Sequence, residues 1–315
     1  MSVRVLSTSP LVGGALEDLG RRFPELRIAP FRTEAWNAAL PGAEALVLML
    51  SEPLTASDLD RAPRLRAIGT YSVGMDHLPL EACRARGIQV VNTPGTLTEA
   101  TADLALALLL AVSRRLAEGE ALVRTGAWRG WAPDQLLGTG LSGKTCGILG
   151  AGAIGRAFAR RAWALGMRVV FWGREGQAGA VDFGPASGPR LPLQDLLEVS
   201  AVLSLHCPLT DATRKLLGRR ELERLPLGAI LINTARGGIF DEEAAMALLA
   251  AGRLGGVGLD VYEGEPDLRT AWLEAPRTVL LPHLGSATRE TRETMAHQLC
   301  DGIAGVLAQD PDRRE

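Results

Sequence analysis

Cysteine is scarce in this sequence: the 315 residues include four cysteines, and no two of them form a Cys-x-x-Cys pair. The wide spacing disfavours both a disulfide framework and a zinc site, and it favours reduced thiols in a cytoplasmic protein. We therefore predict that the chain binds no metal ion. The four cysteines are Cys83, Cys146, Cys207 and Cys300.

Long hydrophobic runs are also missing from the sequence. The longest run, Leu104–Val112, is about half the length of a membrane-spanning helix. The amino terminus enters a predicted strand at once and lacks the charged region, apolar core and cleavage site of a signal peptide. These absences predict a cytoplasmic protein that has no membrane partner.

Neither sign of charge dominates the composition. The net charge is -2, and 22% of the residues are charged while 47% are hydrophobic. This balance is typical of a globular protein and lacks the basic excess of a nucleic-acid binder. The length suits two domains of roughly 100–200 residues each.

Short apolar segments alternate with helical stretches in two separate series, a pattern typical of parallel sheets. We predict two doubly wound α/β domains, each with a parallel sheet. The candidate strands of the first series are Val3–Ser7, Leu26–Ala29, Ala45–Leu50, Arg66–Thr70 and Gln89–Asn92. Those of the second are Thr145–Leu149, Arg168–Trp172, Ala201–Leu205, Ala229–Asn233, Val257–Asp260 and Val279–Leu281.

Three other segments do not fit this alternation of strands and helices. The apolar residues between Thr98 and Glu118 predict one long buried helix. The segment from Gly173 to Pro192 is rich in Gly and Pro and predicts an irregular surface connection. A last helix, Thr288–Leu307, either caps the second sheet or belongs to the first domain, and its periodicity fits both.

The turn Gly150-Ala-Gly152-Ala-Ile-Gly155 lies between a predicted strand and a predicted helix, the setting in which Gly-x-Gly-x-x-Gly binds a dinucleotide. The first glycine permits a tight turn, the second lets the backbone approach a pyrophosphate, and the third lets helix and strand pack closely. Ala153 and Ile154 open the helix, whose free N–H groups attract the anion. We therefore predict that the second domain is a Rossmann domain.

The next predicted strand ends at Gly173-Arg174, where NAD-binding domains carry an acid that binds the ribose 2′-hydroxyl. An acid repels the 2′-phosphate of NADP, whereas an arginine pairs with it. We therefore predict NADP(H) as the preferred cofactor and NAD(H) as the alternative. The competing interpretation is that Arg174 is only solvated.

Polar side chains follow three of the predicted strands in the second series. They are Arg236, the acids Asp260 and Glu265, and His283. Ligands of open parallel sheets bind at the carboxyl ends of the strands. A histidine donates protons near neutral pH, a carboxylate beside it favours the imidazolium, and an arginine grips a substrate carboxylate. Each residue alone is more often structural, but together they predict hydride transfer to a carbonyl.

The motifs around these residues resemble those of the D-isomer-specific 2-hydroxyacid dehydrogenases. They are Asn233-Thr-Ala-Arg236-Gly-Gly, Gly258-Leu-Asp260-Val-Tyr-Glu-Gly-Glu265-Pro, Pro282-His283-Leu-Gly-Ser286-Ala-Thr and Ser72-Val73-Gly74-Met-Asp76. The resemblance implies a flavodoxin-like substrate domain of residues 1–96 and 285–315. A Rossmann domain of residues 97–284 is then inserted into it.

The same resemblance implies a role for each site residue. Arg236 binds the substrate carboxylate and keto group, His283 is the acid–base residue, and Glu265 sets its protonation. Further substrate contacts come from Val73, Gly74, Ser286 and Trp131. The implied cofactor contacts are Gly150, Gly152, Ala153, Ile154, Gly155, Gly173, Arg174, Cys207, Pro208, Thr234, Ala235, Asp260 and Gly285.

The segment Gly126-Ala-Trp128-Arg-Gly-Trp131-Ala-Pro133 is similar to the glyoxylate/hydroxypyruvate reductase branch of the family. In that branch it belongs to a dimer arm, here residues 120–141, which implies a homodimer. Trp131 then reaches the partner's active site, or else it is an ordinary interface or core tryptophan. The implied reaction is the reduction of glyoxylate or hydroxypyruvate, both small 2-oxo acids.

Two other functions are compatible with the motifs. A related dehydrogenase acts on D-lactate, a branched 2-oxo acid or 3-phosphoglycerate, although no extra cations for a phosphate stand out near Ser51–Leu54 or Ser72–Met75. A non-enzymatic, NAD(H)-sensing corepressor-like protein shares the fold and the catalytic set. We expect this second alternative less, because the sequence has almost no tail beyond Ala308.

Overall fold

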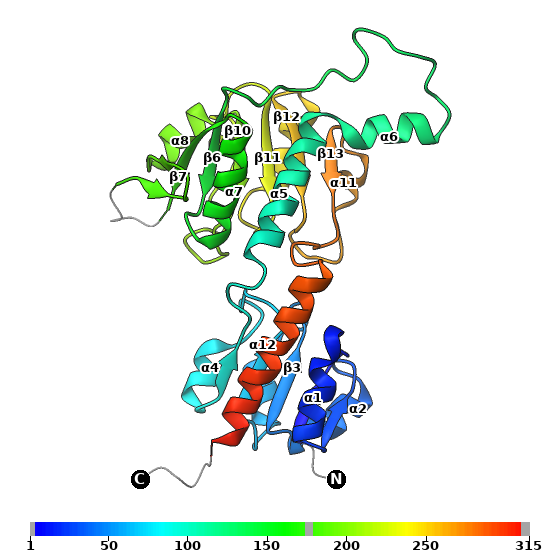
Figure 1. Cartoon of the computed structure of the whole chain (residues 1–315), viewed down its shortest axis with the longest axis vertical. Helices are drawn as coiled ribbons and strands as arrows, with labels where there is room; N and C mark the ends of the chain where they lie inside the picture. Colours follow the sequence, from blue (N-terminus) through cyan, green and yellow to red (C-terminus); the bar gives the residue numbers. More distant parts are fainter. Residues whose placement is uncertain (1–3, 174–178, 310–315) are drawn as a thin grey trace. The chain divides into compact units, whose positions relative to one another are not determined.

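The computed structural model describes residues 4–173 and 179–309. The chain divides into two compact units (Figure 1). One unit takes the chain up to Leu97 and resumes at Ser286, and the other is Thr98–Gly285.

The first unit contains a five-stranded parallel sheet in the order β2-β1-β3-β4-β5. Its strands are β1 Val5–Ser7, β2 Leu26–Ile28, β3 Ala45–Leu48, β4 Ala67–Thr70 and β5 Gln89–Val91. Its α-helices are α1 Ala15–Arg22, α2 Glu34–Ala39, α3 Ala56–Asp60, α4 Leu80–Ala85 and α12 Arg289–Ala308, with short 3-10 helices at Val12–Gly14 and Leu40–Gly42.

Side chains alternate across this sheet because successive strand residues point to opposite faces. Leu46 and Leu48 of β3 pack with residues of α2, α3 and α4, whereas Ala45 and Val47 pack with α1 and α12. The last helix, α12, therefore covers one face of the first sheet, and its alternative placement on the second sheet is excluded.

The second unit contains a six-stranded parallel sheet in the order β13-β12-β11-β10-β6-β7. Its strands are β6 Thr145–Leu149, β7 Arg168–Trp172, β10 Val202–Leu205, β11 Ala229–Asn233, β12 Leu254–Leu259 and β13 Thr278–Leu280. Its helices are α5 Thr98–Ser113, α6 Leu116–Arg124, α7 Ala153–Ala164, α8 Leu193–Val199, α9 Arg219–Leu222, α10 Glu242–Ala250 and α11 Thr270–Glu274.

Both faces of this second sheet are covered, which is why its strands read as nearly continuous apolar runs. Ile230 and Ile232 of β11 face α5 and α7, while Leu231 faces the side of α8, α9 and α10. Every residue of β6, β10 and β11 is buried. The predicted fold class, two parallel-sheet α/β domains, is confirmed.

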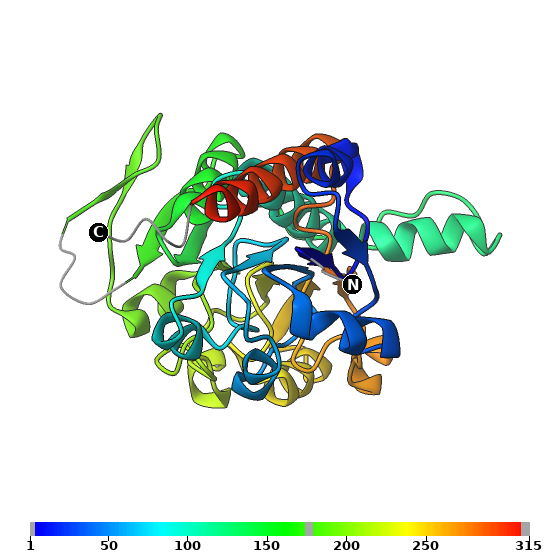
Figure 2. The same ribbon diagram turned by 90° about the horizontal axis from the view of Figure 1, so that it is seen from below.

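The prediction of one helix from Thr98 to Glu118 is wrong, because α5 ends at Ser113 and a separate helix, α6, starts at Leu116. The Ser113 carbonyl accepts a hydrogen bond from the Thr139 amide, 2.8 Å away, instead of continuing the helix. Arg115 then adopts a left-handed backbone with φ 54 and pairs with Glu118 at 2.7 Å. After this break, α6 and the following loop project from the unit (Figures 1 and 2).

The prediction of an irregular connection between Gly173 and Pro192 is only partly right. Strands β8 Val181–Asp182 and β9 Ser187–Gly188 form a small antiparallel hairpin there. Val181 and Phe183 are buried, and the Phe183 ring lies 6.0 Å from that of Phe171 in β7. Burial of these two side chains explains why the hairpin packs against the sheet.

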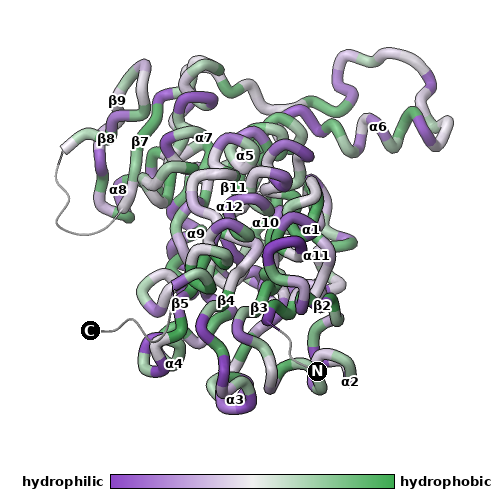
Figure 3. Tube along the Cα trace, turned by 60° about the horizontal axis from the view of Figure 1, so that its bottom comes forward, coloured by the Kyte–Doolittle hydropathy of each residue, from purple (hydrophilic) through white to green (hydrophobic). Residues whose placement is uncertain are grey.

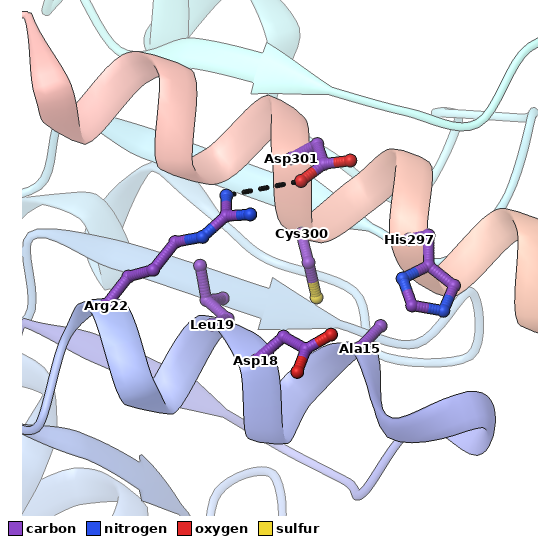
Figure 4. Close-up of a pocket in the computed structure, with 7 residues that line it drawn as sticks. All are labelled: Ala15, Asp18, Leu19, Arg22, His297, Cys300 and Asp301. Carbon is purple, nitrogen blue, oxygen red and sulfur yellow. Dashed lines mark hydrogen bonds and ion pairs between the residues drawn. The ribbon is translucent and has the colours of Figure 1, made fainter.

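A small pocket of the first unit lies between α1 and α12 (Figure 4). Arg22 and Asp301 link the two helices through an ion pair of 3.3 Å. The pocket volume of about 120 Å³ is well below that of most ligand sites. Its lining contains none of the predicted site residues, and we assign it no function.

Among the described residues, no helix has the length and apolar character needed to cross a membrane. The same part of the chain contains no group of three or more His, Cys, Asp or Glu side chains placed to hold a metal ion. All four cysteines are buried free thiols.

Candidate active site

The glycine turn follows β6, which lies between β7 on one side and β10 on the other. The order of strands along the sheet therefore reverses at β6. Gly150 has φ 107, and a Cβ atom there would lie 2.6 Å from the backbone of His206. A Cβ on Gly155 would lie 2.0 Å from the Gly150 oxygen. Both positions exclude a side chain, whereas a Cβ on Gly152 would meet nothing within 4 Å. The backbone at Gly152 is therefore open to a ligand.

The surroundings of this turn suit a dinucleotide. Helix α7 starts at Ala153 and continues through Ile154 for 12 residues, so its amino end carries free N–H groups. The Thr234 hydroxyl, just after β11, is buried without a hydrogen-bond partner in the described structure. Cys207 is buried after β10, and Pro208 beside it is exposed. These residues fit a pyrophosphate and the groups attached to it.

His206 lies beside the same turn but is a structural residue. Its Nε2 lies 2.8 Å from the Ser204 hydroxyl, and its ring packs on Phe158. Burial lowers the pKa of His206 to about 3, so the imidazole is neutral at physiological pH. A histidine held in this form does not act as the proton donor.

Gly173 directly follows β7, at the same edge of the sheet as the glycine turn. No acid stands at this position, as the sequence already indicated. Arg174, to which we assigned the 2′-phosphate contact, lies outside the described residues.

Glu265 and His283 form a hydrogen-bonded pair, with 2.7 Å between Glu265 Oε1 and His283 Nδ1. Their side chains are 31% and 25% exposed, which leaves both accessible to a ligand. The second carboxylate oxygen of Glu265 accepts the Tyr262 amide at 3.4 Å. Because Nδ1 of His283 is engaged, Nε2 is the ring nitrogen that remains for a substrate.

Asp260 fixes the backbone at His283 and at the two residues that follow it. Its carbonyl accepts the His283 amide at 2.9 Å, and its carboxylate accepts the amides of Leu284 and Gly285 at 2.6 and 2.8 Å. These contacts hold His283 at a positive φ of 55, an unfavourable conformation for a residue with a side chain. Burial raises the pKa of the Asp260 carboxyl, against the opposing effect of the Leu284 amide and the His283 charge.

Arg236 lies in a turn after β11 that is shaped by Asn233. The Asn233 side chain donates to the Arg236 carbonyl at 2.7 Å and accepts the Ala235 amide at 3.0 Å. Arg236 Nη1 donates to the Ala235 carbonyl at 2.8 Å. A Cβ on Gly237 would lie 2.0 Å from the backbone of Tyr262. The Arg236 turn is therefore packed against the segment that follows β12.

The remaining predicted substrate residues come from other segments of the chain. Val73, Gly74 and Ser286 belong to the first unit, where the Val73 carbonyl accepts a hydrogen bond from the Asn92 side chain at 2.9 Å. Trp131 lies in the loop after α6 and is 83% exposed.

Sequence reasoning missed Glu242, at the start of α10, which is 1% exposed. Its Oε1 accepts the Glu263 amide at 2.7 Å, and its Oε2 accepts the Trp272 indole N–H at 2.9 Å. Glu242 thus ties the segment that leads to Glu265 onto α10 and α11. An acid in the first turn of a helix is common, so the sequence pattern alone gives no sign of this role.

We expect Glu242→Gln to lower turnover about tenfold to a hundredfold, because small displacements of a catalytic group have effects of that size. Glutamine offers one acceptor oxygen to two N–H donors. In the double variant with Trp272→Phe only the Glu263 amide needs an acceptor, so turnover should recover in part. Glu243→Gln is the matched control, since Glu243 is 73% exposed. An equal loss in the single and double variants would rule out the positioning role.

Taken together, the sheet order, the glycine turn and the helix after it define a dinucleotide-binding domain of the Rossmann class. Residues 106–285 match the family described as D-isomer specific 2-hydroxyacid dehydrogenase, NAD binding domain. The chain belongs to this family, as the sequence motifs predicted, and its second unit is the NAD(P)-binding domain.

Similar proteins cover most of the chain. A glyoxylate reductase of Thermococcus gammatolerans is 44% identical, over 94% of this chain and 90% of its own. A glycerate dehydrogenase of Hyphomicrobium methylovorum is 42% identical, over 84% and 82%. The crystal structure of the TT0316 protein from Thermus thermophilus matches with a TM-score of 0.89 and 46% identity, covering 97% of both chains.

Proposed function

We propose that this protein reduces small 2-oxo acids to 2-hydroxy acids, with glyoxylate and hydroxypyruvate as its best substrates. The 2.7 Å pair of Glu265 and His283, at the same sheet edge as the glycine turn, is the observation that carries this proposal. The names of the two relatives, a glyoxylate reductase and a glycerate dehydrogenase, support the choice of substrate.

His283 is the proposed proton donor. Glu265 engages Nδ1, so Nε2 is the nitrogen that delivers a proton to the oxygen of the keto group as that oxygen gains charge. Asp260 keeps the ring in place through the backbone at residues 283–285.

Arg236 is the proposed anchor for the substrate carboxylate and the stabiliser of the developing alkoxide. A guanidinium suits both tasks because its donors form a planar fork. Val73, Gly74 and Ser286 are proposed further substrate contacts, on the strength of the family motifs that contain them.

NADPH is the proposed preferred cofactor, and it supplies the hydride when bound. The open backbone at Gly152 and the unpartnered hydroxyl of Thr234 support a pyrophosphate contact at this turn. The absence of an acid at Gly173, together with Arg174 in the sequence, supports the preference for a 2′-phosphate. Ala235, Asp260 and Gly285 are proposed to contact the cofactor at the strand ends.

A homodimer formed through the arm at residues 120–141 is also proposed. Exposed large hydrophobic side chains in and next to this arm support it, since such a surface favours protein contacts. They are Leu116, Val123, Trp128, Trp131 and Leu137. Trp131, at 83% exposure, is the residue proposed to reach the partner's active site.

Initial rates with glyoxylate, hydroxypyruvate, pyruvate and 3-phosphohydroxypyruvate, each with NADPH and NADH, test the proposed function. We expect the highest kcat/KM for the first two acids and for NADPH, and light scattering should give twice the chain mass. Preference for pyruvate would instead indicate a D-lactate dehydrogenase. Cofactor binding without reduction of any acid would indicate the corepressor-like alternative.

A further inference from the structure

Arg190 lies beside the end of β7, although it comes 17 positions after Gly173 in the sequence. After the β8–β9 hairpin, residues 189–191 run parallel to β7: the Phe171 amide donates to the Pro189 carbonyl and the Leu191 amide to the Phe171 carbonyl, both at 2.9 Å. Figure 3 shows the hairpin next to β7. Backbone hydrogen bonds therefore fix the position of Arg190 at this edge.

The Arg190 side chain occupies the space in front of Gly173. A Cβ atom on Gly173 would lie 2.7 Å from Arg190 Nη1. This is the space into which an acid at position 173 would project, and such an acid binds the ribose 2′-hydroxyl in NAD-specific domains. The fold thus places a cation where those domains place an anion.

Among the described residues, no acceptor explains the position of the Arg190 guanidinium. Arg190 Nη1 is buried and has no hydrogen-bond partner among the described residues. Several other arginines of the same unit pair with acids, such as Arg161 with Asp103 at 2.7 Å and Arg224 with Glu198 at 2.8 Å. A buried donor without an acceptor is unfavourable, so an anion at this position would be bound strongly.

We propose that Arg190 binds the 2′-phosphate of NADP(H) and is a specificity-determining residue of the cofactor site. This inference rests on the proposed function only in that the second unit must bind a nicotinamide dinucleotide. A phosphate at the ribose 2′-position presents oxygens to the guanidinium fork and gives Nη1 its acceptor. A 2′-hydroxyl lacks the charge that makes this contact favourable.

Binding of 2′,5′-ADP and 5′-AMP to the full-length protein, measured by calorimetry without substrate, tests the proposal. The two ligands differ by the 2′-phosphate. We expect Arg190→Met to weaken 2′,5′-ADP about tenfold to a hundredfold and to change 5′-AMP less than about twofold, the range for a charged hydrogen bond. Arg190→Lys should retain part of the affinity, because it keeps the charge without the fork.

The matched control is Arg168→Met, since Arg168 is exposed at the opposite end of β7. It should leave the affinity for both ligands unchanged. A wild-type protein that binds both ligands equally would overturn the proposal. Equal weakening of both ligands in Arg190→Met would also overturn it, because that pattern indicates a structural role.

The converse variant is Gly173→Asp. Its carboxylate would point towards the Arg190 guanidinium. It would pair with that group and repel a 2′-phosphate. We expect 2′,5′-ADP to weaken at least about tenfold while 5′-AMP remains bound. An unchanged preference for 2′,5′-ADP in this variant would contradict the proposal.

Two comparisons separate this proposal from a contact made by Arg174 and from the proposed reductase activity. If Arg174→Met abolishes the preference for 2′,5′-ADP and Arg190→Met leaves it intact, the contact belongs to Arg174 and the proposal is overturned. The binding assay needs no turnover. A selective loss of 2′,5′-ADP in Arg190→Met therefore supports the proposal even if the protein reduces neither glyoxylate nor hydroxypyruvate.

Discussion

Replacing His283 by glutamine should lower the turnover of glyoxylate and hydroxypyruvate by about 10²- to 10⁴-fold, the usual contribution of a general acid. Glutamine still reaches Glu265 but carries no transferable proton near neutral pH. The contacts of Asp260 with the backbone at residues 283–285 remain, so the fold and the cofactor site should be unaffected. The measurement is steady-state kcat and KM with the cofactor at saturation.

His297→Gln is the matched control for this variant, because His297 is exposed on α12 in the first unit. It should retain the wild-type rate. Cofactor binding by His283→Gln, followed by fluorescence, distinguishes a chemical defect from misfolding. A folded His283→Gln protein with near-wild-type turnover would refute the assignment of His283 as proton donor.

Glu265→Gln extends the same test. The amide keeps a hydrogen-bond partner for Nδ1 of His283 but removes the negative charge beside the ring. We expect kcat for glyoxylate to fall in this variant while the protein stays folded, because the ring loses the negative charge that faces it during proton transfer. A folded Glu265→Gln protein with wild-type kcat would contradict the proposed role of the carboxylate.

The sheets could be predicted from the sequence because their strands are buried on both faces. Segments such as Thr145–Leu149 and Ala229–Asn233 each have a single polar residue, at one end, and the structure has both strands with these bounds. The spacing of glycines 150, 152 and 155 indicated the turn, because the tight turn and the close packing exclude a Cβ at positions 150 and 155. Local sequence was sufficient to predict these elements, because their own backbone geometry and burial restrict which residues they can contain.

Prediction failed where a distant segment decides the local structure. Nothing between Thr98 and Glu118 disfavours a helix strongly, and the break at Arg115 depends on a contact of Ser113 with Thr139. The β8–β9 hairpin likewise depends on Val181 and Phe183 reaching the core beside β7. Both contacts join residues far apart in the chain and have no local signature.

The same limit applies to the candidate site. His283, Glu265 and Arg236 follow strands, so their common position at one sheet edge could be predicted from the order of strands. Glu242 and Arg190 act through tertiary contacts alone, with the Glu263 amide and at Gly173. A Glu in a first helical turn and an Arg in a surface connection are ordinary in sequence, and only the fold distinguishes them.

Replacing Arg236 by alanine should lower kcat/KM for glyoxylate by about 10²- to 10⁴-fold. Removal of one donor to a developing oxyanion lowers the rate by about 10²- to 10³-fold in other enzymes, and the substrate carboxylate loses its ion pair as well. The turn itself should survive, because the Asn233 side chain bonds to the backbone of residues 235 and 236 and not to the guanidinium. Thermal unfolding of the variant checks this expectation.

Arg236→Lys separates charge from geometry. Lysine keeps a positive charge that attracts the carboxylate, but it lacks the fork that holds two oxygens at once. We therefore expect KM to recover more than kcat in this variant, because binding needs the charge while the alkoxide needs a donor in a fixed direction. Arg220→Ala, on the exposed side of α9, is the control that should change neither parameter. If Arg236→Lys matched the wild type in both parameters, Arg236 would act as a point charge only, and its proposed role at the keto oxygen would be wrong.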